Sequence, residues 1–123
     1  MKSLGEQTYA LMRITVGFAF ACHGSQKLLG FPPGGPDEMN PMLYVAGSIE
    51  LIGGLLVMIG LLTHWAAFLS SGLMAAAYWL AHGTHAPLPI QNHGELAFLY
   101  CFVFLFISSR GPGIWSVDGA RNA

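Results

Sequence analysis

The feature that most constrains this chain is a succession of four long apolar stretches. They cover about residues 8–29, 42–62, 65–82 and 90–109. A bilayer core about 30 Å thick needs about 20 apolar residues in a helix, and backbone that faces lipid must satisfy its own hydrogen bonds. We therefore predict an all-α protein, an integral membrane four-helix bundle in which residues 1–123 form a single domain.

The composition excludes several other classes of protein. Hydrophobic residues make up 54% of the chain and charged residues only 9%, whereas a soluble domain carries about 25% charged residues. The net charge is -1, so the basic surface that binds phosphates is missing. We therefore exclude a soluble globular enzyme and expect no nucleic-acid partner.

The distribution of charge outside the apolar stretches predicts the orientation. Lys2, Arg110 and Arg121 lie near the two termini, whereas the loop at 31–41 carries acidic residues and no basic one. Short cytoplasmic segments are enriched in Lys and Arg. We therefore predict a multi-pass protein of the inner (cytoplasmic) membrane of a prokaryote, with both termini in the cytoplasm.

Four charged residues fall inside the apolar stretches, where an unpaired charge is costly and is a functional candidate. From their signs and depths we expect Lys27 to pair with Glu95, and Arg13 to pair with Glu50. Two interpretations remain open for these intramembrane pairs. They either only fix the register of the helices or take part in the function.

Glycines accompany these charges at helical spacing. Gly17 and Gly24 share a stripe with Arg13 and Lys27 on the first helix. On the second helix, glycines three residues before and four residues after Glu50 share its face. Small residues allow membrane helices to approach closely, so we predict a tight contact of these faces with neighbouring helices.

A polar group on the predicted outer side is the candidate binding site. Its members are His23, Lys27, Tyr78, His82 and Glu95. Hydrogen-bonding groups beside an apolar, aromatic-walled cleft suit a quinone or a lipid headgroup, so we predict a ligand-binding site of this kind.

The histidines on the predicted outer side are only weak evidence for a metal or haem site. His82 and His85 have a spacing of three residues, but Gly83 and Pro87 indicate that the helix ends there. We therefore expect no metal or haem site and no cofactor of the protein's own, with quinone as the one candidate ligand of that kind. Serines such as Ser48, Ser70 and Ser71 lie in helices without an adjacent base and an orienting carboxylate, so we predict no catalytic residue.

The order of these motifs resembles the DoxX family of small four-helix membrane proteins. The resemblance covers about residues 8–119, and its members are RITVG at 13–17, HGSQKL at 23–28, ELIGG at 50–54, GLLT at 60–63, MAAA at 74–77, GE at 94–95 and GPGIWSVD at 111–118. The matched polar positions are Arg13, His23, Lys27, Glu50 and Glu95. His82, His85 and His93 match no motif of the family.

The resemblance implies a role beside membrane redox enzymes. The family takes its name from membrane subunits linked to a terminal quinol oxidase and a thiosulfate:quinone oxidoreductase in sulfur-oxidising archaea. We predict a small accessory subunit of a larger membrane oxidoreductase or electron-transfer complex, packing on partner helices and in contact with lipids. Two alternatives stay open. One is a self-contained membrane oxidoreductase with a quinone site, and the other is a lipid-binding or assembly factor without redox chemistry.

Overall fold

The chain is helical throughout the part that the structure describes. The computed structural model describes residues 2–83, 88 and 94–121, without the side chains of residues 2, 3 and 81–83. Across these ranges there is no strand. The elements are α1 (Lys2–Leu29), α2 (Pro41–Ile59), α3 (Thr63–Ala77), the π-helix η1 (Tyr78–Gly83), α5 (Glu95–Arg110) and the short α6 (Val117–Arg121). The all-α prediction is confirmed for the described residues, and the number of membrane spans stays a prediction.

Helix α2 begins and ends at residues whose chemistry stops a helix. Pro41 stands in the first turn, where a missing N–H costs nothing, and the Asn40 side chain accepts a hydrogen bond from the Leu43 N–H at 2.8 Å. At the other end Gly60 has a φ of 73°. This left-handed conformation ends the helix, so α2 stops three residues before the predicted boundary at residue 62.

The other helices differ from the predicted ranges at their ends. Helix α1 begins at Lys2 instead of near residue 8, and α3 begins at Thr63 instead of 65. The last predicted turn of the third helix forms η1, whose hydrogen bonds reach five residues back along the chain. Helix α5 begins at Glu95; the predicted start near residue 90 lies outside the described residues.

Helices α1 and α2 pack with their backbones in direct contact. A Cβ added to Gly17 would lie 2.7 Å from the carbonyl oxygen of Gly54, and a Cβ added to Gly54 would lie 2.6 Å from the carbonyl oxygen of Gly17. Farther along the pair, a Cβ added to Gly24 would lie 2.6 Å from the carbonyl oxygen of Gly47, whereas one added to Gly47 would meet the side chains of Leu28 and Lys27. Only glycine permits this separation, so the predicted close helix contact is confirmed.

Helices α3 and α5 form a second pair, and one core joins the two pairs. The Ser71 hydroxyl of α3 donates a hydrogen bond to the Cys101 carbonyl of α5 at 2.7 Å. The core between the pairs is apolar and includes Phe20, Val57, Phe104 and Ile107, all fully buried.

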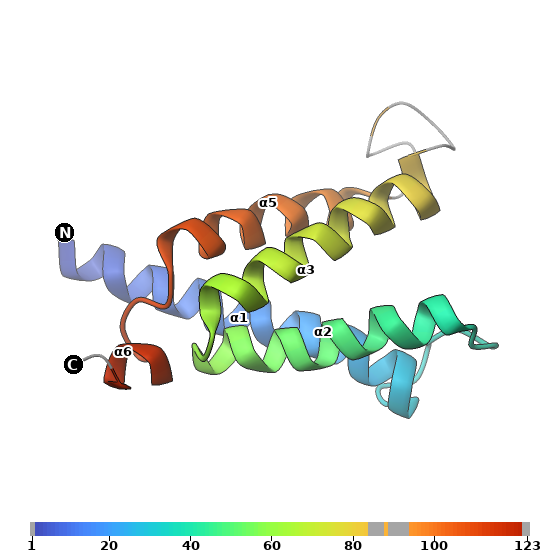
Figure 1. Ribbon diagram of the computed structural model, residues 1–123, viewed down its shortest axis with the longest axis horizontal. Helices are drawn as coiled ribbons and strands as arrows, with labels where there is room; N and C mark the ends of the chain where they lie inside the picture. The colour runs from blue at the N-terminus through green and yellow to red at the C-terminus, as the bar shows by residue number, and fades with distance from the viewer. Residues whose placement is uncertain (1, 84–87, 89–93, 122–123) are drawn as a thin grey trace.

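The two pairs meet at one end of the molecule and separate toward the other. Figure 1 shows α2 and α3 joined by a tight turn and diverging from it. The start of α1, this turn and α6 lie at one end, which we call the tail end. The opposite end holds the loop between α1 and α2 together with η1, and we call it the open end.

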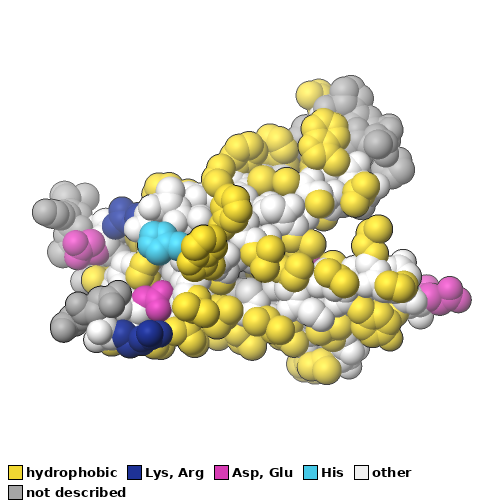
Figure 2. Space-filling model, in the orientation of Figure 1, with side chains coloured by type: hydrophobic (Ala, Val, Ile, Leu, Met, Phe, Trp, Pro, Cys, Tyr) yellow, Lys and Arg dark blue, Asp and Glu magenta, His cyan; other side chains and the backbone are white. Residues whose placement is uncertain are grey.

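The surface is largely apolar. Large hydrophobic side chains are exposed on every long helix, among them Phe18, Ile52, Phe68 and Phe102, and yellow side chains dominate the face in Figure 2. Basic and acidic side chains both lie at the tail end of that face, and another acidic one projects from the open end. Among the described residues, one helix, Pro41–Ile59, is long and apolar enough to cross a bilayer, with 28% of its apolar window buried.

Candidate functional site

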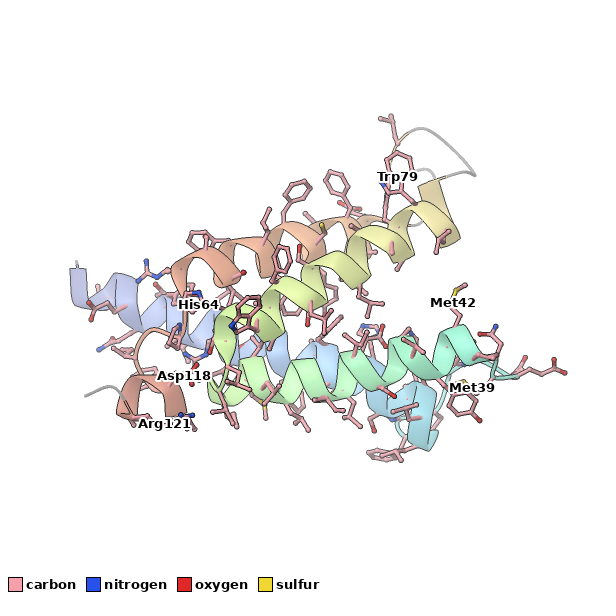
Figure 3. The ribbon with its side chains drawn as sticks, in the orientation of Figure 1. Met39, Met42, His64, Trp79, Asp118 and Arg121 are labelled. Atoms are coloured by element: carbon pink, nitrogen blue, oxygen red, sulfur yellow. The ribbon has the colours of Figure 1, made fainter. Side chains whose placement is uncertain are left out.

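A cavity of about 610 Å³ lies at the open end, between the two helix pairs. All four long helices and η1 contribute to its wall. Its apolar lining includes Phe20, Leu43, Ala46, Leu73, Met74, Ala77, Leu80, Leu96 and Ala97. Met42 also lines it, and in Figure 3 this side chain points from α2 into the space below α3, whereas Trp79 points away. The cavity therefore offers a long apolar surface to a ligand.

One ion pair supplies the charged part of the wall. Lys27 Nζ of α1 lies 2.7 Å from Glu50 Oε1 of α2. The Glu50 residue is 3% exposed, and its second oxygen, Oε2, is buried without a hydrogen-bond partner among the described residues. His23 and Tyr100 also line the cavity, with their rings edge to face at a centroid separation of 6.2 Å. Polar groups therefore gather on the α1 and α2 side of an apolar chamber.

The rim of the cavity carries the π-helix. Leu80 of η1 and Ala77 at the end of α3 both line the space. A single wide π-helical turn is rare and recurs at functional sites, because it re-aims the side chains that follow it. Here the regular α-helical hydrogen bonding of the third helix ends next to the cavity.

The structure brings some of the predicted site residues together and separates others. His23 and Lys27 line the cavity. Tyr78 does not line it; its ring packs against Phe98 at 5.6 Å. Glu95 is exposed at the start of α5. The side chain of His82, and all of His85 and His93, lie outside the described residues.

Both predicted charge pairs differ from the pairs in the structure. Lys27 pairs with Glu50 and not with Glu95, for which no ion pair occurs within the described ranges. Arg13 pairs with no carboxylate in the part of the chain that the structure describes. The cause is the antiparallel register of α1 and α2, in which Gly17 lies beside Met58 and Gly24 beside Leu51. In that register Arg13 lies beside the end of α2, and its side chain is too far from Glu50 to pair with it.

Arg13 instead binds backbone carbonyls at the tail end. Its side chain is completely buried, with 0% exposure. The guanidinium donates to two carbonyls at the end of α2 and to three carbonyls in the C-terminal segment between α5 and α6. The acceptors are Val57 at 3.0 Å, Met58 at 3.5 Å, Pro112 at 2.5 Å, Ile114 at 3.0 Å and Trp115 at 2.7 Å. One buried cation therefore fixes the tail against the helix pair.

The sequence interpretation missed this role for Arg13. A signal was present in the run Gly-Pro-Gly at 111–113, because residues outside helices and strands leave their carbonyls without regular partners. A buried arginine with five N–H groups can satisfy several of them together.

Asp118 forms a second link at the tail end. Its carboxylate accepts hydrogen bonds from the Leu62 N–H, the Thr63 N–H and the Thr63 hydroxyl at 3.1, 3.0 and 3.2 Å, and so caps the start of α3. Partial burial raises the pKa of Asp118, but these hydrogen bonds and the nearby Arg121 outweigh it and hold the pKa below its ordinary value. Figure 3 shows Asp118, Arg121 and His64 together at this end.

Three further contacts close the tail end. The Tyr9 hydroxyl donates to the Gly111 carbonyl at 2.7 Å, and the Arg110 guanidinium lies 4.3 Å from the centre of the Tyr9 ring. The Ser108 hydroxyl donates to the His64 carbonyl at 3.0 Å, joining α5 to α3. The tail end is therefore tied across all four long helices.

No cluster of three or more metal-binding side chains occurs among the described residues. His23 and His64, the two histidines whose side chains are described, stand at opposite ends of the molecule. The arrangement that the described chain does offer is an apolar cavity with an ion pair on its wall.

Comparison with known proteins finds relatives over most of the length of this chain. The chain is 42% identical to an uncharacterized protein of Haemophilus influenzae over 116 residues, which cover 89% of this chain and 87% of that protein. It is 26% identical to the inner membrane protein YqjF of Escherichia coli, over 99% of this chain and 98% of the relative. No solved structure matches it. The model of the DoxX family matches residues 8–83, so the chain is a small membrane protein that belongs to the DoxX family.

Proposed function

We propose that this protein is a multi-pass inner-membrane protein that binds an isoprenoid quinone or quinol in the cavity at its open end. The observation that carries the proposal is the cavity itself, about 610 Å³ of largely apolar space with one buried ion pair on its wall. The name of the Escherichia coli relative, an inner membrane protein, supports the location.

The distribution of surface groups supports the multi-pass topology. Exposed apolar side chains cover all the long helices, and such a surface is stable only against lipid or a partner. Arg110 and Arg121 stand at the tail end, and Asp37 and Glu38 lie in the loop at the open end. By the positive-inside rule the tail end faces the cytoplasm, together with both termini.

The size and lining of the cavity support the class of ligand. Cavities of about 300–1,000 Å³ with apolar walls and a few polar groups are typical of small-molecule sites. A ring-shaped head fits beside His23 and Tyr100, where aromatic edges and faces make favourable contacts. An isoprenoid tail fits the aliphatic side formed by Leu73, Leu80 and Leu96.

The ion pair supports a head with oxygen atoms. Lys27 uses one of its three N–H groups on Glu50, and the remaining two are available to an oxygen acceptor. Because the pair lies in an apolar wall, each hydrogen bond to it is stronger than in water. A hydrocarbon without oxygen would leave these groups unused.

The direct test is to identify what the protein carries. The protein is extracted from its own membrane in mild detergent, and bound small molecules are released into organic solvent and measured by mass spectrometry. We expect a quinone or quinol close to one per chain. Ala46→Phe fills the cavity and should remove the ligand, whereas Ile52→Phe, on the exposed face of the same helix, should keep it.

Two outcomes would contradict the proposal. Recovery of phospholipid alone, in equal amounts from both variants, would favour a lipid-binding or assembly factor without redox chemistry. Retention of quinone by the Ala46→Phe variant would mean that quinone binds elsewhere on the protein.

A second candidate, compatible with the first, is an accessory subunit of a larger membrane oxidoreductase. The exposed face of α5 favours it, since Leu99, Phe102 and Phe106 form an apolar stripe at helical spacing. A photo-crosslinking amino acid at residue 102 should then capture one defined membrane protein, and the same probe at residue 68 of α3 serves as control. Labelling of lipid alone at both positions would contradict the subunit role.

A further inference from the structure

One atom in the cavity wall lacks the partner that its chemistry requires. Glu50 Oε1 accepts from Lys27, but Oε2 is buried with no hydrogen-bond donor among the described residues. A buried acceptor without a donor is destabilising relative to the same atom in water. Glu50, which lines the cavity, therefore carries an acceptor without a donor.

The surroundings of Glu50 limit where that donor comes from. The residue lies on the α2 face that contacts α1, beside the glycines that bring the two backbones together. The side-chain exposure is 4% for Glu50 and 23% for Lys27, so bulk water reaches the lysine more readily than the carboxylate. Glu50 itself lines the cavity. A molecule bound in the cavity is therefore the source that we consider for the missing donor.

We infer that the site selects a ligand whose head carries a hydroxyl donor, and therefore binds the reduced hydroquinone in preference to the quinone. This inference rests on the proposed function and specifies the redox state of its ligand. A hydroquinone hydroxyl donates to Glu50 Oε2 and its oxygen accepts from Lys27. A quinone carbonyl only accepts, so it satisfies Lys27 and leaves Glu50 Oε2 without a partner.

The size of the preference follows from the one hydrogen bond that differs. A hydrogen bond to a charged group contributes enough to change an affinity by about tenfold or more. The preference requires no transfer of electrons, because it concerns binding alone.

The test compares ligands that differ only in the donor. Binding of 2-decylhydroquinone, its dimethyl ether and 2-decylbenzoquinone to the detergent-solubilised protein is measured without oxygen by equilibrium dialysis. We expect the hydroquinone to bind at least about tenfold more tightly than either of the others. The dimethyl ether has the same ring and tail but no donor, so it isolates the hydroxyl group from the redox state.

Variants assign the preference to the carboxylate. Glu50→Gln replaces the acceptor by an amide that also donates, and should bring the three affinities within about threefold of one another. Ile52→Phe, on the exposed face of the same helix and outside the cavity wall, should keep the preference of the unmodified protein. If Glu50→Gln fails to fold, the comparison of the three ligands on the unmodified protein still decides the inference.

Each outcome has a separate meaning. Equal affinities for all three ligands would overturn the hydroxyl selection while leaving quinone binding in place. No binding of any of the three would overturn the proposed function itself. A preference that survives Glu50→Gln would overturn the role of Glu50.

Discussion

At the tail end, the buried guanidinium of Arg13 donates to five carbonyls; at the open end, the buried carboxylate of Glu50 has one partner and an unsatisfied oxygen. Both groups lie on the contact between α1 and α2. Arg13 is surrounded by fixed protein acceptors, whereas Glu50 faces a cavity of about 610 Å³.

This difference separates stability from function in one helix pair. A saturated network of buried hydrogen bonds stabilises a single arrangement, and a partly satisfied one is costly unless something else completes it. We therefore expect the single largest loss in the free energy of unfolding at the tail end, from Arg13, and the largest change in ligand binding at the open end.

The largest loss of stability is expected for Arg13→Leu. The Val57 carbonyl keeps the Gly60 N–H as a donor, and the other four acceptors are partly buried. An unsatisfied buried acceptor costs about 1–3 kcal/mol, so even the lower end of that range for these four predicts a loss of at least about 3 kcal/mol or a failure to fold. Titration with sodium dodecyl sulfate in mixed micelles, followed by circular dichroism, measures it. Arg13→Lys should give an intermediate loss, because lysine has three donors. A loss below about 1 kcal/mol for Arg13→Leu would contradict the anchoring role.

A smaller loss is expected when the ion pair at the open end is broken. Lys27→Met should cost about 2 kcal/mol, less than a fully buried pair because Lys27 is partly exposed. The double variant Lys27→Met and Glu50→Leu should return to within about 1 kcal/mol of the original protein, because two apolar residues replace the pair. The same titration measures both. A double variant as unstable as Lys27→Met would mean that the pair is needed for folding.

The next effect belongs to the cap of α3 and depends on pH. Asp118→Asn should lower the free energy of unfolding by about 1 kcal/mol at neutral pH. Because the pKa of Asp118 is lowered in the folded protein, the carboxylate stabilises the fold above its ordinary pKa of 3.8. That contribution is lost as the pH falls through the lower folded value.

Thermal unfolding of both proteins across this range checks the prediction. The difference in melting temperature should be full at neutral pH and shrink below about pH 4. A difference that is the same at all pH values would show that the charge of Asp118 does not contribute.

The smallest effect is expected for His23→Phe at the open end. The His23 ring makes an edge contact with Tyr100, which phenylalanine can keep, so stability should change by less than about 0.5 kcal/mol. Tyr9→Phe at the tail end is the matched variant, and it should cost about 1 kcal/mol because it loses the bond to Gly111. Equal effects measured in one thermal unfolding series would remove the distinction between the two ends.

Much of the fold was predictable from local sequence. The apolar stretches predicted the helices, and the spacing of Gly17, Gly24, Gly47 and Gly54 predicted the close contact that the structure contains. The site was predictable in part, since His23 and Lys27 line the cavity. The predicted partners were wrong, because the sequence carries the depth of a charge on its own helix but not the register between two helices.

The sequence by itself determined the helical, lipid-compatible character of this DoxX-family protein, because composition and periodicity act within one helix at a time. Only the tertiary structure decided that Arg13 holds the tail, that Lys27 meets Glu50, and that the two helix pairs separate around a cavity. These outcomes depend on the register that two helices adopt where their glycine-lined faces are in contact. A shift of one helical turn, about 5.4 Å, is enough to exchange the partners of a buried charge.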